Sequence, residues 1–186
     1  MTARAERILL VPGAGNSGPD HWHTHWQATD RTIQRVKQAD WNDGTRAQWI
    51  EALDRDVRAS SASVVLAAHS MGAVLVAHWA AAHRGPIAGA LLVAPADVEG
   101  NWAGEGSLYR RFAPIPMMRL PFASIVVAST NDPYLSISRA QELAKAWGSR
   151  LHVVGALGHV GSDAKLGNWE PGLKLLDGLR EIRAGD

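Results

Sequence analysis

Apolar residues gather along the chain in six short blocks that predict β-strands. Each block is rich in Leu, Val, Ile or other β-formers, and several are apolar almost throughout. Such runs are typical of strands that are covered on both faces of a parallel sheet. The six predicted strands are Arg7–Val11, Thr32–Gln38, Ser63–Ala68, Ile87–Ala94, Ser124–Ser129 and Leu151–Gly155.

The segments between most of these strands carry the start and stop signals of helices. Thr45–Gln48 and Ser138–Gln141 each match a capping box, and apolar residues follow each at helical spacing. The Ala-rich stretch after Met71 runs into His-Arg-Gly-Pro at 83–86, where basic residues, a glycine and a proline favour a helix end. Pro171 can open a last helix.

Alternation of strands and helices predicts a doubly wound α/β fold, with helices on both faces of a mainly parallel sheet. No repeat, linker or low-complexity segment divides the chain, so we expect a single domain over residues 1–186. The one long irregular stretch is Val98–Pro121, which is rich in Gly and Pro. Long loops in compact domains are often functional.

Composition narrows the function classes. Lys and Arg number 19 against 18 Asp and Glu, so there is no basic excess to neutralise nucleic-acid phosphates. The absence of cysteine excludes disulfides, thiolate metal sites and cysteine nucleophiles. No apolar run is long enough for a membrane span, and the N-terminal MTARAERILLVPG lacks the features of a signal peptide. We expect a cytoplasmic protein; a protein partner is possible, but nothing in the sequence indicates one.

Ser70 is the candidate nucleophile. The sequence Ala-His-Ser-Met-Gly at 68–72 follows an apolar strand and leads straight into a helix, which is the context of a nucleophile elbow. Small residues two before and two after the serine permit the strained turn that exposes its Oγ. The alternative is that Ser70 merely caps the helix, because serine is common at helix starts.

An elbow serine needs an acid and a base at the ends of later strands, in the order Ser, Asp, His. Asp132 follows the fifth predicted strand and His159 follows the sixth, where loops of open α/β sheets gather catalytic groups. Asp97, after the fourth strand, is the competing acid, while Asp163 is too close to His159 in sequence to reach it easily. His69 is expected to diverge from the serine beside it.

The glycine loop after the first strand has two interpretations. Gly13–Gly18 matches G-x-G-x-x-G, and Asp40 stands about twenty residues on, as in a dinucleotide site. Pro19 argues against this, because the residue before a proline is steered away from helical geometry and the third glycine must pack within the helix. In a hydrolase the loop can instead supply the Ala14 N–H to an oxyanion hole, together with the N–H of Met71.

Aromatic and histidine residues supply the remaining candidates. His21 and His25 share a helix face that could bind a metal, but no further ligand is evident, so we expect no metal and a structural role flanking the site. For substrate contacts we expect Trp22 near this cluster, and Trp102, Met117 and Met118 on the long loop. The alternative is that the loop's apolar residues, which also include Tyr109 and Phe112, seal the edge of the core.

Five segments carry a resemblance to a known family. They are VPGAGNSGPDHW, AHSMG, STNDPYLS, WGSRL and GHVGSDAKLGNW, and they span nearly the whole chain. The chain resembles small lid-less α/β-hydrolases of the retinoblastoma-binding protein nine type and their bacterial relatives. This resemblance implies a six-stranded, mainly parallel sheet without a separate cap domain and a triad of Ser70, Asp132 and His159. Ala68 replaces the commoner first glycine of the elbow, and the residues after His159 differ somewhat from the usual pattern.

The sequence therefore predicts a serine hydrolase that cleaves an ester or related acyl bond of a small molecule, without a cofactor. Two alternatives remain: a catalytically silent interaction module with the same fold, and a dinucleotide-binding protein that uses the Gly13–Gly18 loop.

Overall fold

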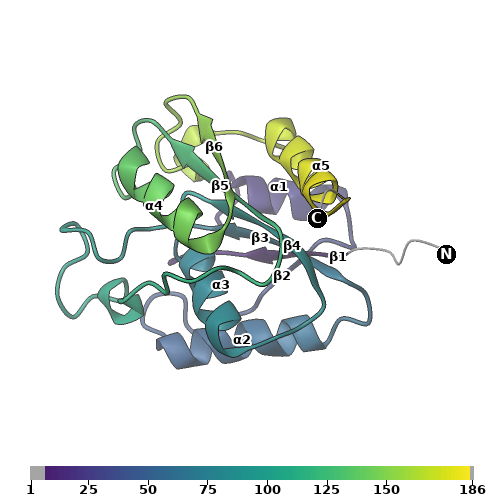
Figure 1. Cartoon of the computed structure of the whole chain (residues 1–186), viewed down its shortest axis with the longest axis horizontal. Coiled ribbons are helices and arrows are strands. Elements are labelled where there is room, and N and C mark those ends of the chain that lie inside the picture. Colours follow the sequence, from purple (N-terminus) through teal and green to yellow (C-terminus); the bar gives the residue numbers. More distant parts are fainter. Residues whose placement is uncertain (1–6, 185–186) are drawn as a thin grey trace.

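A single twisted sheet forms the centre of the protein, and all of its neighbouring strands are parallel (Figure 1). The computed structural model describes residues 7–184, of which 180–184 are described by backbone alone; residues 1–6, part of the segment examined for a signal peptide, lie outside it. The strand order is β2-β1-β3-β4-β5-β6. The strands are β1 (Arg7–Val11), β2 (Gln34–Arg35), β3 (Val64–His69), β4 (Ile87–Val93), β5 (Ser124–Ser129) and β6 (Arg150–Val154).

Five helices cover the two faces of this sheet. One face packs against α1 (Trp22–Thr29) and α5 (Glu170–Ala184), and the other against α2 (Arg46–Arg58), α3 (Met71–Ala82) and α4 (Ile137–Trp147). Figure 1 shows α1 and α5 across the sheet from α2 and α3. Successive residues of a strand point to opposite faces, so Leu66 of β3 enters one core and Val65 and Ala67 the other. Between residues 7 and 184 no separate cap domain covers the sheet.

The sequence located all six strands, but it overestimated the strand predicted at Thr32–Gln38. Only Gln34 and Arg35 pair there, and they pair with Leu9 and Leu10 of β1. β2 is one of the two outer strands of the sheet and has a partner on one side alone. Short edge strands of this kind present few unpaired backbone groups to other chains.

The helix start predicted at Ser138 is wrong. α4 begins at Ile137, and the Oγ of Ser136 caps it by accepting a hydrogen bond from the N–H of Arg139 at 3.1 Å. Ser138 therefore lies inside the first turn, where its Oγ is 3.0 Å from that of Ser136. Two serines two residues apart both resemble a cap, and the sequence pattern alone favoured the wrong one. The capping box at Thr45 is confirmed in full.

The long stretch predicted as irregular, Val98–Pro121, contains only one short 3₁₀ turn, at Arg110–Phe112. α3 ends at Ala82, directly before the predicted stop sequence. Within the described part of the chain, no helix is both long enough and apolar enough to cross a bilayer.

Gly72, the second residue of α3, lies against the end of β1. A Cβ placed on Gly72 would be 2.0 Å from the carbonyl oxygen of Val11 and 2.7 Å from that of Pro12. Both neighbours are backbone, so no rotamer change can relieve the overlap. We expect Gly72→Ala to lower the free energy of unfolding by about 3 kcal/mol or more in urea denaturation. Gly104→Ala is the control, because a Cβ there meets nothing within 4 Å; equal stability of the two variants would contradict this close approach.

Candidate active site

Ser70 occupies a strained turn between β3 and α3. Its backbone has φ of 57° and ψ of −124°, a conformation that residues with a side chain rarely adopt. Its N–H donates to the carbonyl of Val93 at 3.0 Å, which ties the turn to β4. The side chain makes no capping hydrogen bond to α3, so the helix-cap interpretation does not describe this serine. The turn instead leaves the Oγ free to face a cavity.

His159 lies between Ser70 and Asp132. Its Nε2 is 2.8 Å from Ser70 Oγ, and its Nδ1 is 2.8 Å and 3.0 Å from the two carboxylate oxygens of Asp132. The Asp132 side chain has no exposed surface, and one of its oxygens also accepts from the N–H of Tyr134 at 2.9 Å. With Asp132 accepting at Nδ1, the other ring nitrogen is left unprotonated toward the serine hydroxyl.

The loops that carry Asp132 and His159 are fastened to each other by Asn131. Its side-chain oxygen accepts from the N–H of Gly158 at 2.7 Å and from the hydroxyl of Ser129 at 2.9 Å. Ser129 Oγ in turn accepts from the N–H of Leu157 at 3.0 Å. This short network fixes the distance between the ends of β5 and β6, and with it the spacing of the carboxylate and the imidazole.

The competing acids lie elsewhere. Asp97 forms an ion pair with Arg139 of α4 at 3.3 Å, so its charge is directed away from His159. Asp163 lines the cavity but makes no hydrogen bond to His159. Asp132 is thus the carboxylate that the structure brings to the imidazole.

The glycine loop after β1 packs directly against the elbow. A Cβ on Gly13 would lie 2.9 Å from Ser70 Cβ and 3.2 Å from the Met71 nitrogen, so the bare backbone of glycine permits this approach. In the described structure the N–H of Ala14 has no hydrogen-bond partner. The N–H of Met71 is the first of α3, where no intrahelical acceptor exists. Neither N–H group has an acceptor in the described structure, and both belong to segments that meet at the Ser70 turn.

The geometry of this loop does not suit a dinucleotide. α1 begins at Trp22, so Gly18, the third glycine of the fingerprint, lies outside the helix in which it would need to pack. Asp40, the expected ribose ligand, instead accepts hydrogen bonds from the N–H groups of Asn42 and Asp43.

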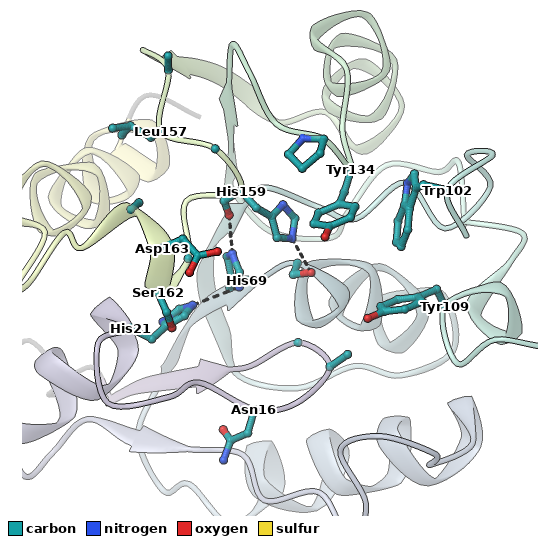
Figure 2. Close-up of a pocket in the computed structure, with 18 residues that line it drawn as sticks. Asn16, His21, His69, Trp102, Tyr109, Tyr134, Leu157, His159, Ser162 and Asp163 are labelled. Atoms are coloured by element: carbon teal, nitrogen blue, oxygen red, sulfur yellow. Dashed lines mark hydrogen bonds between the residues drawn. The ribbon is translucent and has the colours of Figure 1, made fainter. Parts of the chain in front are cut away.

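Buried imidazoles form a hydrogen-bonded chain that ends at the backbone oxygen of His159. The sequence did not reveal this chain. His69 Nε2 lies 2.8 Å from the backbone oxygen of His159, and His69 Nδ1 lies 3.2 Å from His21 Nε2 (Figure 2). His21 Nδ1 accepts from the N–H of His23 at 3.1 Å and so caps α1. One assignment satisfies every contact: each ring is neutral and carries its proton on Nε2.

Burial keeps these rings neutral. It lowers the pKa of His21 to about 3, with smaller contributions from Arg35 and His159. Burial also holds the pKa of His69 well below its usual range, helped by the neighbouring His21 and His159. Between residues 7 and 184 no group of three His, Asp, Glu or Cys side chains is arranged to hold a metal. The Nε2–H of His21 is used in the hydrogen bond to His69 Nδ1.

His69 is expected to act as a positioning residue for His159. In His69→Phe the hydrogen bond to the His159 carbonyl is lost, and we expect the turnover number (kcat) of any reaction at Ser70 to fall about 10- to 100-fold with little change in KM. His69→Gln can still donate from its amide and should recover part of the rate. His78→Phe is the control, since His78 is also buried and bonded to a carbonyl, that of Phe112 at 2.7 Å. Equal kcat in His69→Phe and the wild type would contradict this role.

A cavity of about 670 Å³ opens over Ser70 and His159. Of the predicted substrate contacts, Trp102 lines it, and so do Ala14 and the loop residue Tyr109. Tyr134 lines it as well, although the sequence gave no signal beyond its place two residues after Asp132.

The structure places the other predicted contacts outside the cavity lining. Trp22 is fully buried, and its indole N–H donates to the carbonyl of Val160 at 2.9 Å, so it supports the His159 loop rather than meeting substrate. Met117 and Met118 are exposed, but they lie outside the cavity lining. Phe112 belongs to the core. The residues of the long loop thus divide between the cavity wall, the core and the surface.

A model of the serine hydrolase family matches residues 8–178, which is most of the chain. The chain belongs to the serine hydrolase family. No curated protein sequence matches this serine hydrolase. Among solved structures, it is similar to a YdeN-like hydrolase from Pectobacterium atrosepticum, with 35% identity, a TM-score of 0.84, and coverage of 95% of this chain and 91% of that one.

More distant structures share the fold of this serine hydrolase. The ydeN gene product of Bacillus subtilis is 15% identical, with a TM-score of 0.70 and coverage of 95% of this chain and 100% of that one. Est1E from Butyrivibrio proteoclasticus, solved with ferulic acid, is 13% identical, with a TM-score of 0.70 and coverage of 94% and 90%. These likenesses support the α/β-hydrolase fold predicted from the sequence.

Proposed function

We propose that this serine hydrolase cleaves an ester or related acyl bond of a small molecule through a triad of Ser70, His159 and Asp132. One observation carries the proposal: the His159 ring meets a buried carboxylate at one nitrogen and the hydroxyl of a strained elbow serine at the other. The motifs that resemble the retinoblastoma-binding protein nine type support placing the chain in that branch, as one domain over residues 1–186.

The proposed reaction passes through an acyl-enzyme. His159 Nε2 takes the proton of Ser70 Oγ as the oxygen attacks the carbonyl carbon of the substrate. Asp132 holds the ring in the required tautomer and stabilises the imidazolium that forms. The carbonyl oxygen becomes an oxyanion within reach of the N–H groups of Met71 and Ala14, the donors proposed for the oxyanion hole.

Breakdown of the acyl-enzyme restores the site. The tetrahedral intermediate expels the alcohol, which receives its proton from His159. A water molecule then attacks the acyl carbon while His159 accepts a proton from it, and His159 passes this proton to Ser70 Oγ as the bond to the acyl carbon breaks and the acid is released. The step uses only side chains and backbone groups of this chain and the substrate water.

Turnover of p-nitrophenyl acetate tests this proposal. The wild type is expected to release p-nitrophenol with saturation kinetics, and Ser70→Ala is expected to lose about 10⁴-fold or more in kcat. Ser138→Ala, on the exposed start of α4, is the matched control and should retain the wild-type rate. Undiminished turnover in Ser70→Ala would contradict the proposal, and a folded wild type without any turnover would favour the silent interaction module.

A further inference from the structure

Four aromatic rings stand in a row along one side of the cavity. The ring centroids of Tyr109 and Trp102 are 4.9 Å apart, those of Trp102 and Tyr134 are 4.8 Å apart, and those of Tyr134 and His159 are also 4.8 Å apart. Figure 2 shows Tyr134, Trp102 and Tyr109 on one side of His159, across from Asn16, His21 and Ser162. We call Tyr109, Trp102 and Tyr134 the aromatic wall. It leads from the outer cavity to the imidazole that faces Ser70.

The long loop, which carries Trp102 and Tyr109 of the aromatic wall, is held in place on both sides of Trp102. The guanidinium of Arg110 donates to the carbonyls of Gly100 and Ala103 at 3.1 Å and 2.7 Å, which closes the turn around the indole. A Cβ on Gly100 would lie 3.0 Å from the Trp102 ring, so the indole rests on bare backbone. These contacts come from the loop itself, so we expect the wall to be ordered before a substrate binds.

Arg139 of α4 holds the first part of the same loop. Its guanidinium forms ion pairs with Asp97 and Glu99, and a fifth of the Arg139 side chain is exposed. Tyr134 is joined to this segment by its carbonyl, which accepts from the N–H of Asp97 at 3.0 Å. The long loop and the segment of Tyr134, which together carry the aromatic wall, are therefore held at a fixed distance from each other.

The rest of the cavity lining offers little to an alkyl chain or an anion. Leu157 is the only large aliphatic side chain among the described residues that line it. Asp163 is the only lining residue there with a formal charge, and no Lys or Arg is present to pair with a carboxylate or phosphate. Apart from Leu157 and Pro133, the larger apolar side chains of the lining are therefore aromatic.

We propose that the aromatic wall is a subsite for an uncharged aromatic ring on the substrate, so that the enzyme favours aryl-bearing esters over saturated ones of the same size. This inference rests on the proposed esterase function. Aromatic rings prefer edge-to-face and offset contacts at the spacing seen within the wall, and such contacts add affinity beyond that of the buried area. A saturated ring of similar shape buries a similar area but lacks the π-system.

Matched pairs of esters separate the contribution of the π-system from that of the buried area. The first pair is methyl 3-phenylpropanoate and methyl 3-cyclohexylpropanoate, with the ring in the acyl part. The second is benzyl acetate and cyclohexylmethyl acetate, with the ring in the alcohol part. For at least one pair, we expect the wild type to show a kcat/KM about three- to tenfold higher for the aryl ester.

Two variants test whether Trp102 is responsible for the preference for aryl esters. Trp102→Leu should reduce the aryl-to-saturated ratio to about one, because it removes the central ring of the wall. Met117→Ala, on the same long loop but outside the cavity lining, should keep the wild-type ratio. Wild-type ratios of one or less in both pairs, or an unchanged preference in Trp102→Leu, would overturn the subsite.

A binding measurement separates this proposal from the esterase function. In Ser70→Ala, calorimetry should give a dissociation constant about three- to tenfold lower for the favoured aryl ester than for its saturated partner. That difference without wild-type hydrolysis of any ester would support the subsite and contradict the proposed reaction. Hydrolysis of both members of each pair at equal kcat/KM, with equal binding, would support the reaction and overturn the subsite.

Discussion

Replacing Asp132 by Asn is expected to lower kcat for p-nitrophenyl acetate by about 10⁴-fold. The Asp132 side chain is fully buried and both of its oxygens lie within 3.0 Å of His159 Nδ1. An amide in its place can donate to that nitrogen, which favours the tautomer with the proton on Nε2. His159 then cannot accept the serine proton, although the shape of the site is preserved.

Asp97→Asn is the matched control, because Asp97 was the competing acid in the sequence and lies next to Arg139 instead. We expect this variant to keep kcat within about twofold of the wild type. Far-UV circular dichroism of both variants checks that the fold is intact. A large loss of kcat in Asp97→Asn, with little loss in Asp132→Asn, would reverse the assignment of the acid.

Acidification is expected to destabilise the protein strongly through its buried imidazoles. Burial lowers the pKa of His21, His23 and His69, so these rings stay neutral in the folded state at pH values where the unfolded chain binds protons. The unfolded state then binds more protons, and stability falls as the pH drops below about 6.5. For His21, whose pKa is lowered to about 3, this removes about 2 kcal/mol from the free energy of unfolding between pH 7 and pH 5, and His23 and His69 act in the same direction.

Urea denaturation at pH 7 and pH 5 measures this effect. The three rings together lower the free energy of unfolding by more than the contribution of His21 alone, about 2 kcal/mol, which is a large part of the stability of many domains. His69→Phe should show a smaller pH dependence than the wild type, because one of the three rings is absent. Equal free energies of unfolding at the two pH values would contradict the neutral, buried chain of histidines.

A strand of this fold could be predicted well where it is buried on both faces of the sheet, because nearly all of its residues are then apolar. β3 is buried at all six positions, and the sequence located it within one residue at each end. β2 was predicted too long, because an edge strand is set by how many residues pair with β1 and not by its own composition. The choice between Ser136 and Ser138 as a cap depended on backbone angles that the pattern does not record.

The place of the candidate catalytic residues could be predicted from the sequence for a similar reason. Ser70, Asp132 and His159 each follow a strand, so topology alone predicted that they gather at one edge of the sheet. Trp22 was misassigned because a residue beside the site in sequence can point into the core. The imidazole chain and Tyr134 depended on side-chain directions. The sequence predicted that His69 turns away from Ser70, but no local spacing reports that it meets the His159 backbone.

Covalent labelling with a fluorophosphonate tests the central claim most directly, because the reagent modifies a serine only when its hydroxyl is activated. The folded wild type is expected to take up one phosphonyl group, which peptide mass spectrometry should locate on Ser70. Ser70→Ala should remain unlabelled under the same conditions, and Asp132→Asn should react much more slowly. A folded wild type that remains unlabelled, or that is labelled at another residue, would contradict Ser70 as the nucleophile.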